Sequence, residues 1–509
     1  MSRTPLSRRR LLELFGAAGA SAVLARDAAA VPSVPPSPSR RPRRDASALS
    51  EALADLVAKH RMPGAVAAVY SKGKVESAGA GIANLNTGAP MTAGTGFLTG
   101  SITKVWCATL VMSFVDEGAI DLDLPVVRYL PRLRFADAEA TRQITTRQLL
   151  NHSSGLDAGD FIMDLGEGPL AHTAFVEAMS GLGQIHRPGA YSSYCNGGWV
   201  LAGHLLETLS GKSWHQLLEE RVIRPLGLER TFAYAEDGIL FGSAVGGVPD
   251  PKRPGEHMAT PKFLLPKTFA PAGATLITTV EDNLRFARLH MRGGTSLGGT
   301  RVVSEGSARA MATRTIDHPS GPASGFGLGW MLSTLDGRTM LSHGGGSNGG
   351  RAQLAAVPDA DFAYATFVNS NVSGGFQAEL QSWIASNYGF GQPESLGGRA
   401  MSAVANAPAI DRSRFVGTYR RTTTKVTIRE EGEKLILTSE WILSEAPGTE
   451  AYVIGAPTVF EMVPVNDHAL ALASADPSGP RALWTFLEPD RTGRFGLMYA
   501  NGRLARRID

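Results

Sequence analysis

A serine and a lysine three positions apart, Ser101 and Lys104, have the residue types and spacing that acyl-transfer chemistry needs. Positions i and i+3 share one face of a helix, so the lysine nitrogen can reach the serine hydroxyl there. A serine hydroxyl is a weak nucleophile, and a desolvated lysine with a lowered pKa can supply the base that it needs. The apolar run over residues 102–115 predicts a buried helix that carries the pair. Ser101 would then lie at a helix N-terminus, where backbone N–H groups favour developing negative charge.

Two further polar residues, Tyr194 and Asn196, are candidates for the same site. Residues two apart on an extended or loop segment face one cleft, with the tyrosine toward Ser101 and the asparagine toward a substrate amide or Lys104. A phenol held near an ammonium group can shuttle a proton to the leaving group. The sequence leaves open whether Lys104 or Tyr194 takes the first proton from the serine.

A glycine run that starts at His343 follows an expected strand over residues 338–342. Glycine at such a place lets the backbone approach a substrate closely. The run also contains a Gly-x-Ser-x-Gly motif around Ser347, which is the nucleophile elbow of α/β-hydrolases. That motif requires a helix after the serine, whereas residues 352–358 favour another strand. Ser101 is therefore the predicted nucleophile.

Taken together, these motifs resemble the serine β-lactamase and penicillin-recognising DD-peptidase superfamily, in its class C-like branch. That family combines Ser-x-x-Lys, Tyr-x-Asn, and a Lys or His followed by a small residue and Gly. The resemblance extends from about Asp45 to about Phe390. It also includes Leu149 to Leu156, Pro188-Gly189, Pro271-Ala272-Gly273 and Phe326 to Trp330.

The resemblance implies a role for each motif residue. Ser101, Lys104 and Tyr194 are catalytic, Asn196, His343 and Gly345 bind substrate, and the N–H groups of Ser101 and Gly346 form the oxyanion hole. Two departures from the class C pattern concern substrate choice, since His343 replaces the usual lysine and Gly344 the usual threonine. The carboxylate contact typical of β-lactam recognition is therefore not implied. The chain also lacks the separate Glu-x-x-x-Asn loop of class A enzymes.

The N-terminal segment resembles a twin-arginine export signal, with three arginines within residues 7–12. A short apolar stretch over 14–24 and a small-residue cleavage site over 27–30 follow, so we expect residues 1–30 to be removed on export to the periplasm or beyond. No stable membrane span is expected after cleavage. Residues 1–30 hold five arginines against two carboxylates, so their loss lowers the formal net charge from +3 to about zero and nucleic acid is not indicated as a partner. Residues 31–44 are Pro-, Ser- and Arg-rich, as in a disordered tether.

Cofactor chemistry has little support in the sequence. The chain has two cysteines, Cys107 and Cys195, which exclude a disulfide framework and are expected as buried free thiols, with a bond between them left open. No His, Cys, Asp and Glu cluster has metal-ligand spacing, so neither a metal nor another cofactor is expected. His152, within Asn-His-Ser-Ser-Gly, is interpreted as a structural turn histidine bonded to backbone.

The elements that must position these residues fall into two parts. A first hairpin is expected over residues 65–70 and 75–83, and helical periodicity dominates from 102 to 290. Strands are then expected over 327–332, 340–342, 353–357 and 362–369, before a helix over 377–387. The predicted fold class is α+β, an antiparallel sheet flanked by helices, with a helical subdomain that carries Tyr194 and a cleft between the two.

Domain boundaries follow from composition. The predicted catalytic domain covers residues 45–390, a linker covers 391–409, and residues 410–509 alternate as in an all-β domain. That last domain resembles the lipocalin-like β-barrel appended to several β-lactamase-fold peptidases, D-aminopeptidases and peptide cyclases among them. We expect it to serve as a packing or dimerisation module, and it is where a homo-oligomer would form.

The predicted protein is an exported serine hydrolase that forms an acyl-enzyme on Ser101. His343 and the barrel favour a peptidase or amidase of D-amino-acid-containing peptides over a carboxylesterase or a weak class C-like β-lactamase. An acyl transferase or peptide cyclase, or a penicillin-binding sensor without turnover, would use the same residues. The expected partner is a small-molecule or short-peptide substrate, held by loops over 155–183 and 232–269 whose sequences do not specify it.

Overall fold

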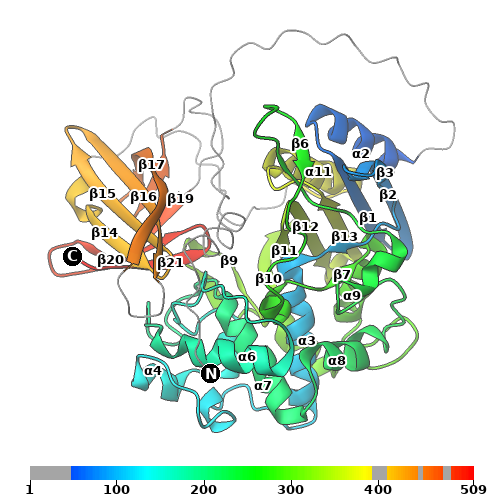
Figure 1. Ribbon diagram of the computed structural model, residues 1–509, viewed down its shortest axis with the longest axis horizontal. Coiled ribbons are helices and arrows are strands. Elements are labelled where there is room, and N and C mark those ends of the chain that lie inside the picture. The colour runs from blue at the N-terminus through cyan, green and yellow to red at the C-terminus, as the bar shows by residue number, and fades with distance from the viewer. Residues whose placement is uncertain (1–46, 392–409, 445–450, 474–482) are drawn as a thin grey trace, which may run out of the picture.

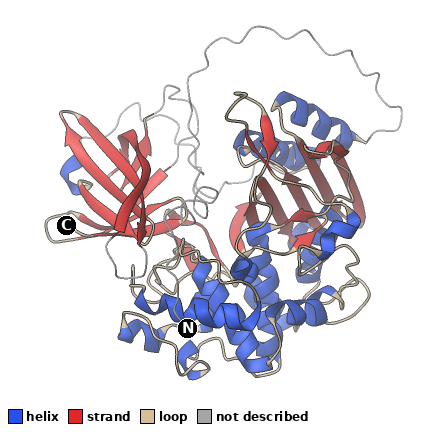
Figure 2. Ribbon diagram, viewed as in Figure 1, coloured by secondary structure: helices blue, strands red, loops and turns tan. Residues whose placement is uncertain are grey.

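The computed structural model describes residues 47–391, 410–444, 451–473 and 483–509. The predicted leader, tether and most of the linker lie outside these residues. The described residues form a domain of helices around a large sheet and, beside it, a β-barrel (Figures 1 and 2). The predicted α+β class with a C-terminal barrel is thereby confirmed.

The large sheet has nine strands among the described residues, and all of its neighbouring pairs are antiparallel. The predicted first hairpin is present as its second and third strands. Across the sheet, the order is β3 (Ala89–Pro90), β2 (Lys74–Asn84), β1 (Gly64–Ser71), β13 (Phe362–Val368), β12 (Gly350–Val357), β11 (Arg338–Ser347), β10 (Met331–Leu335), β9 (Gly321–Phe326) and β8 (Ile316–His318). Because β1 pairs with β13, the first and last parts of the domain meet at the centre of the sheet.

Helices cover both faces of this sheet. Along β1, alternate residues enter two different cores, since successive side chains of a strand point to opposite faces. On one face pack α2 (Ala48–Lys59) and α11 (Gly374–Asn387), and on the other pack α3 (Thr103–Asp116) and α9 (Val280–Met291). Every residue from 103 to 114 is buried, so the apolar run in the sequence corresponds to a helix enclosed on all sides.

A helical lobe surrounds the lower part of α3, where Figure 1 shows α4, α6, α7 and α8 together below the sheet. Its helices are α4 (Ala138–Gln143), α5 (Thr146–Leu150), α6 (Gly168–Ala178), α7 (Asn196–Ser210) and α8 (Trp214–Leu218). The remaining helix of the domain is α10 (Glu305–Ala312), and two small sheets pair β4 (Phe97–Leu98) with β7 (Ile277–Thr278) and β5 (Gly247–Pro249) with β6 (His257–Ala259). In the part of the chain that the structure describes, no helix has both the length and the apolar character to cross a membrane.

One expected strand differs from the prediction, whereas the turn and strand that follow Ser347 agree with it. The strand predicted over 327–332 is wrong for residues 327–330, which form the turn between β9 and β10. Gly329 has φ +85°, which reverses the chain, and the buried Trp330 supplied the apolar character that resembled a strand. Beyond Ser347, a turn leads directly into β12, so no helix follows the Gly-x-Ser-x-Gly motif.

The C-terminal domain is a closed barrel of eight strands within the described residues. They are β14 (Gly417–Arg421), β15 (Thr424–Glu431), β16 (Lys434–Ser444), β17 (Ala451–Asn466), β18 (Ala469–Leu472), β19 (Leu483–Pro489), β20 (Phe495–Ala500) and β21 (Arg503–Arg507). Alternate residues of β15 and β16 point into a packed interior with Phe415, Tyr419 and Phe486. The lipocalin-like resemblance therefore identified this domain correctly as a β-barrel.

Candidate active site

Ser101 and Lys104 lie together at the start of the buried helix. Ser101 belongs to a short 3₁₀ turn, Gly100–Ile102, and α3 begins two residues later. The Lys104 side chain is fully buried, and its Nζ lies 3.0 Å from Ser101 Oγ and 2.6 Å from the carbonyl oxygen of Ala272. The i, i+3 spacing thus brings the amine to the hydroxyl as the sequence predicted.

The surroundings of Lys104 favour an uncharged amine. Burial lowers the pKa of Lys104 well below its usual range, and the positive charge of Arg503 lowers it further. Among the described residues, Lys104 forms no ion pair with a carboxylate. A neutral amine in contact with a hydroxyl can accept that hydroxyl's proton.

Glycine backbones meet closely around Ser101. Gly100 has φ +58°, and a Cβ there would lie 2.5 Å from the carbonyl oxygen of Gly346 and 2.6 Å from its nitrogen. Gly273 has φ +131°, and a Cβ there would lie 2.9 Å from the Ser101 nitrogen. These positions require glycine for both their conformation and their space. The amides of Ser101 and Gly346 therefore lie near one another, as the predicted oxyanion hole requires.

Strand β11 leaves part of one edge open beside this turn. Its pairing with β10 ends at Ser342, so among the described residues 343–347 pair with β12 alone. A Cβ on Gly345 would lie 1.9 Å from the carbonyl oxygen of Thr99, so the close packing of β11 on the 3₁₀ turn requires this glycine. The predicted role of Gly345 in substrate binding stays a prediction.

Tyr194 lies in the loop before α7, with its ring centroid 4.9 Å from Lys104 Nζ. Burial raises the pKa of the Tyr194 phenol, while a hydrogen bond to Ser101 and the charge of Arg503 oppose this rise only in part. The phenol is therefore protonated at neutral pH. Asn196 is the first residue of α7, and its Nδ2 donates to the carbonyl oxygen of Gly159 at 2.9 Å.

His343 is a neutral, buried ring in this site. Its side chain is 1% exposed, and its ring centroid lies 6.2 Å from that of Tyr194. Nδ1 lies 2.6 Å from the carbonyl oxygen of Gly344, which only accepts, so Nδ1 carries the proton and Nε2 has a lone pair. Burial and then the charge of Lys104 lower the pKa of His343 to about 3. At neutral pH, this position therefore lacks the cation that a lysine would provide.

The sequence did not indicate two other residues that contact Tyr194. His152 accepts a hydrogen bond from the Cys195 nitrogen at 3.0 Å, which confirms its prediction as a backbone-bonded histidine, but its ring also stacks on Tyr194 at 4.2 Å. Arg503 reaches the same ring from the barrel, with its guanidinium carbon 5.3 Å from the ring centroid. Contacts between segments so far apart in the chain leave no local sequence signal.

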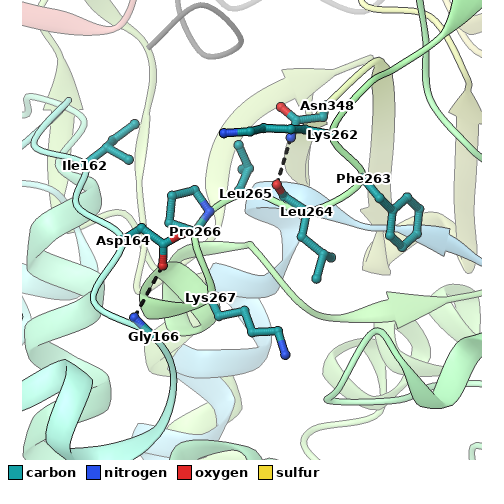
Figure 3. Close-up of a pocket in the computed structure, with 10 residues that line it drawn as sticks. All are labelled: Ile162, Asp164, Gly166, Lys262, Phe263, Leu264, Leu265, Pro266, Lys267 and Asn348. Carbon is teal, nitrogen blue, oxygen red and sulfur yellow. Dashed lines mark hydrogen bonds between the residues drawn. The ribbon is translucent and has the colours of Figure 1, made fainter. Parts of the chain in front are cut away.

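A cavity of about 340 Å³ lies between the two loops that were expected to shape the pocket (Figure 3). Its lining residues are Ile162, Asp164, Gly166, Lys262, Phe263, Leu264, Leu265, Pro266, Lys267 and Asn348. Asn348 follows β11 directly, and its Nδ2 donates to the carbonyl oxygen of Leu264 at 2.9 Å. The cavity does not include Ser101, but it begins two residues beyond Gly346 and has mainly apolar side chains.

The two cysteines do not form a disulfide in the structure. Cys107 and Cys195 are both buried free thiols, and burial raises the pKa of Cys107 to about 12. The described residues contain no group of three or more His, Cys, Asp and Glu side chains arranged to hold a metal ion.

Fold and site together define a hydrolase of the serine β-lactamase type, with the predicted nucleophile in the turn before the buried helix and the glycine strand beside it. The chain belongs to the Beta-lactamase family, whose model matches residues 49–386. That range contains Ser101, Lys104, Tyr194 and His343, but it ends before the barrel.

The chain is also similar to curated proteins of this family. It is 35% identical over 372 residues to "Penicillin-binding protein 4" from Amycolatopsis lactamdurans, which covers 71% of this chain and 94% of that protein. It is 27% identical over 341 residues to a D-aminopeptidase from Brucella anthropi, which covers 65% of this chain and 60% of the D-aminopeptidase.

A solved structure extends the similarity to both domains. The crystal structure of SurE superimposes with a TM-score of 0.72 and 26% identity, over 91% of this chain and 98% of that chain. SurE has also been solved with D-Leu, and that structure gives a TM-score of 0.70 and 25% identity over 91% of this chain and 99% of that chain. A match of this extent includes the barrel as well as the β-lactamase domain.

Proposed function

We propose that this protein hydrolyses amide bonds in peptides that contain D-amino acids, through an acyl-enzyme on Ser101. The observation that carries the proposal is the buried Lys104 amine, 3.0 Å from Ser101 Oγ. Its lowered pKa supplies a neutral base without any metal or further side chain between base and nucleophile.

The first half of the reaction would acylate the enzyme. Ser101 Oγ attacks the substrate carbonyl while Lys104 Nζ accepts the hydroxyl proton, and the N–H groups of Ser101 and Gly346 stabilise the oxyanion. The protonated phenol of Tyr194 donates its proton to the leaving amine as the C–N bond breaks, and the proton on Lys104 restores the phenol. The pKa directions of the two groups support this division, with Lys104 as the first base.

The second half would release the acid. Water attacks the ester on Ser101, the same amides stabilise the second oxyanion, and the proton of the water passes through the Tyr194 and Lys104 pair to Ser101 Oγ. The products are the free carboxylic acid and the original enzyme.

Three observations support a D-peptide substrate over a β-lactam. The neutral His343 gives this site no cation at the position where class C β-lactamases have a lysine. The cavity that Asn348 lines just after β11 has apolar side chains, among them Ile162 and Phe263, that suit an aliphatic or aromatic substrate side chain. A D-aminopeptidase is among the relatives, and SurE, the structural neighbour, has been solved with D-Leu.

A substrate panel tests the proposal. Purified protein is incubated with matched peptides that end in D- or L-residues, with nitrocefin and with p-nitrophenyl esters, and products are separated by chromatography. We expect multiple turnovers on D-peptides, little on the L-diastereomers and slow or no nitrocefin hydrolysis. A preference for nitrocefin would contradict the substrate class, and a single turnover with every compound would indicate a penicillin-binding sensor.

Acyl transfer to an incoming amine is the second candidate, because it needs the same catalytic residues. It uses the same acyl-enzyme and differs in the final acceptor. Adding an amino-acid amide at increasing concentration separates the two, since a transferase yields mainly the condensed product, whereas a hydrolase continues to yield the acid.

Export by the twin-arginine route and assembly through the barrel are also proposals. N-terminal sequencing of the protein from the extracellular or periplasmic fraction is expected to start after residue 30. Light scattering of the purified chain reports its oligomeric state. A full-length N-terminus on cytosolic protein would overturn the proposal of export. A monomer in solution would overturn the proposal of assembly through the barrel.

A further inference from the structure

The barrel reaches the candidate active site through the hairpin of β20 and β21. The Tyr194 N–H donates to the carbonyl oxygen of Gly502 at 2.9 Å, and the Leu504 N–H donates to Ser193 Oγ at 3.0 Å. On its other side, Ser193 donates its own N–H to the carbonyl oxygen of His152 at 2.8 Å. The segment that carries Tyr194 is therefore held between the barrel and the β-lactamase domain.

Arg503, at the start of β21, points from this hairpin toward Tyr194. Its side chain is 18% exposed, and its guanidinium forms an ion pair with Asp160 at 3.0 Å. It also donates to the carbonyl oxygen of Gly159 at 3.3 Å, which is the same oxygen that accepts from Asn196 Nδ2. One guanidinium thus contacts the surroundings of both members of the Tyr-x-Asn motif.

A second barrel segment binds the same loop. Arg421, the last residue of β14, lies 3.3 Å from Asp160, and Thr422 donates to Asp157 through both its hydroxyl, at 2.6 Å, and its N–H, at 3.0 Å. The same interface also has an apolar cluster, with Ile185 packed against Leu497 and Leu504, but buried charges are costly unless they are paired, and apolar packing alone does not place a charge beside Tyr194. The pairing of Arg503 and Arg421 with Asp160 instead fixes the geometry beside Tyr194.

We propose that Arg503 is a positioning residue for the acyl-transfer site, which holds the Tyr194 ring and the Gly159 carbonyl so that the site is complete only with the barrel docked. This inference rests on the proposed chemistry of Ser101 but not on the identity of the substrate. It assigns the barrel a direct part in the reaction.

The charge of Arg503 gives the inference a second readout. The titratable and charged groups around Tyr194 and Lys104 are His152, His343, Cys107, Cys195, Arg503 and, behind Arg503, Asp160 and Arg421. Although burial raises it, the pKa of Asp160 is lowered overall by Arg503 and Arg421, so the ion pair persists at neutral pH. Loss of Arg503 removes a positive charge that lowers the pKa of Lys104, so more Lys104 is protonated at a given pH.

The experiment measures how fast a fluorophosphonate probe labels Ser101 in the full-length chain, from pH 5 to 10. The variants are Arg503→Ala, Arg503→Lys and, as the matched control, Arg506→Ala, which removes a 2.9 Å hydrogen bond to Ile185 across the same interface. Thermal unfolding of each variant reports whether the chain still folds. If Arg503→Ala does not fold, the comparison with wild type uses Arg503→Lys. For each peptide that a variant hydrolyses, kcat and KM are also measured twice, once with the carboxyl end of the peptide free and once with it amidated.

We expect Arg503→Ala to lower the labelling rate about 10- to 100-fold, which is the typical cost of a misplaced group in an active site. The acidic limb of its pH–rate profile should also shift to higher pH. Arg503→Lys should keep the acidic limb at its wild-type pH, because it keeps the positive charge. Arg506→Ala should label at the wild-type rate.

Equal labelling rates and pH profiles of Arg503→Ala and Arg506→Ala would overturn the inference. So would an unchanged labelling rate with a KM increase confined to substrates that have a free carboxylate, which would make Arg503 a substrate contact. If the probe does not label wild type, the inference and the chemistry on Ser101 both fail, whereas labelling without D-peptide turnover contradicts only the proposed substrate.

Discussion

Two basic side chains lie near the Tyr194 ring, Lys104 from the buried helix and Arg503 from the barrel, and their surroundings differ. Lys104 is fully enclosed, and its Nζ lies within hydrogen-bond distance of the neutral oxygens of Ser101 and Ala272. Arg503 is partly exposed and is paired with Asp160. Burial without a counter-ion favours a neutral amine, whereas an ion pair stabilises a permanent charge. The difference supports the proposed division of roles, in which Lys104 of the helix is the base and Arg503 of the barrel is a fixed charge.

The largest effect should come from making Lys104 permanently charged. Lys104→Arg introduces a permanent cation in the first turn of α3, and a guanidinium does not accept a proton at working pH. We expect acylation of Ser101 to fall about 10³- to 10⁴-fold, the upper part of the range of general acid–base catalysis. Stopped-flow release of p-nitrophenol measures this step, and Lys74→Arg, on the exposed part of β2, is the control. Near-normal acylation by Lys104→Arg would show that Lys104 is not the base, and Lys104 and Arg503 would then not differ in the role proposed for them.

The next effect concerns the distance between Ser101 and Lys104. Gly100→Ala introduces a Cβ 2.5 Å from the Gly346 backbone at φ +58°, so the 3₁₀ turn must move. We expect a loss of about 10²-fold in acylation, because small displacements at a reacting centre have effects of that size. Gly118→Ala is the matched control, since it also has positive φ, +71°, but no neighbouring atom within 4 Å. Both variants should lose stability in thermal unfolding, but Gly118→Ala should keep its acylation rate.

A smaller effect should follow from removing the partner of Arg503. Asp160→Asn leaves the guanidinium without its carboxylate, and we expect acylation to fall up to about 10-fold, near the value of one charge-assisted hydrogen bond. Asp157→Asn is the control, because that carboxyl belongs to the same interface but binds Thr422. A larger loss for Asp157→Asn than for Asp160→Asn would assign the effect to docking of the barrel and not to Arg503.

The smallest effect concerns acid stability. Folded His343 has a pKa of about 3, below the unfolded value of about 6.5, so its contribution is fully present above pH 6.5 and is lost as the pH falls toward 3. Each such histidine should cost about 1 kcal/mol of unfolding free energy between pH 6.5 and 5.5. His343→Asn should flatten that part of the curve of unfolding free energy against pH by this amount in urea titrations. An unchanged slope for His343→Asn would mean that the ring is protonated in the folded protein.

Local patterns made much of the molecule predictable. The apolar run after Ser101 indicated a helix buried on all sides, and the i, i+3 spacing indicated the contact with Lys104, because both depend on neighbours in the sequence. Alternation likewise indicated the strands of the barrel. The turn at 327–330 was not predicted, since the apolar Leu328 and Trp330 resemble a strand, although Gly329 reverses the chain there.

The contacts that set charge in the site were not predictable. Ala272 accepts from Lys104, and Arg503 pairs with Asp160, across long separations in the chain. No residue type or spacing marks such pairs, because the first depends on how distant segments of one domain pack and the second on how the two domains dock. For the same reason, the sequence left the first base open, and only the burial of Lys104 and Tyr194 favours the lysine.

The most direct test of the central claim is the intact mass of the protein after rapid mixing with a D-amino-acid ester or amide and quenching in acid. We predict a mass increase equal to the acyl group, mapped by peptide sequencing to Ser101, that decays as product forms. Ser101→Ala should show no adduct. An adduct on another residue, or turnover by Ser101→Ala at the wild-type rate, would contradict the assignment of Ser101 as the nucleophile.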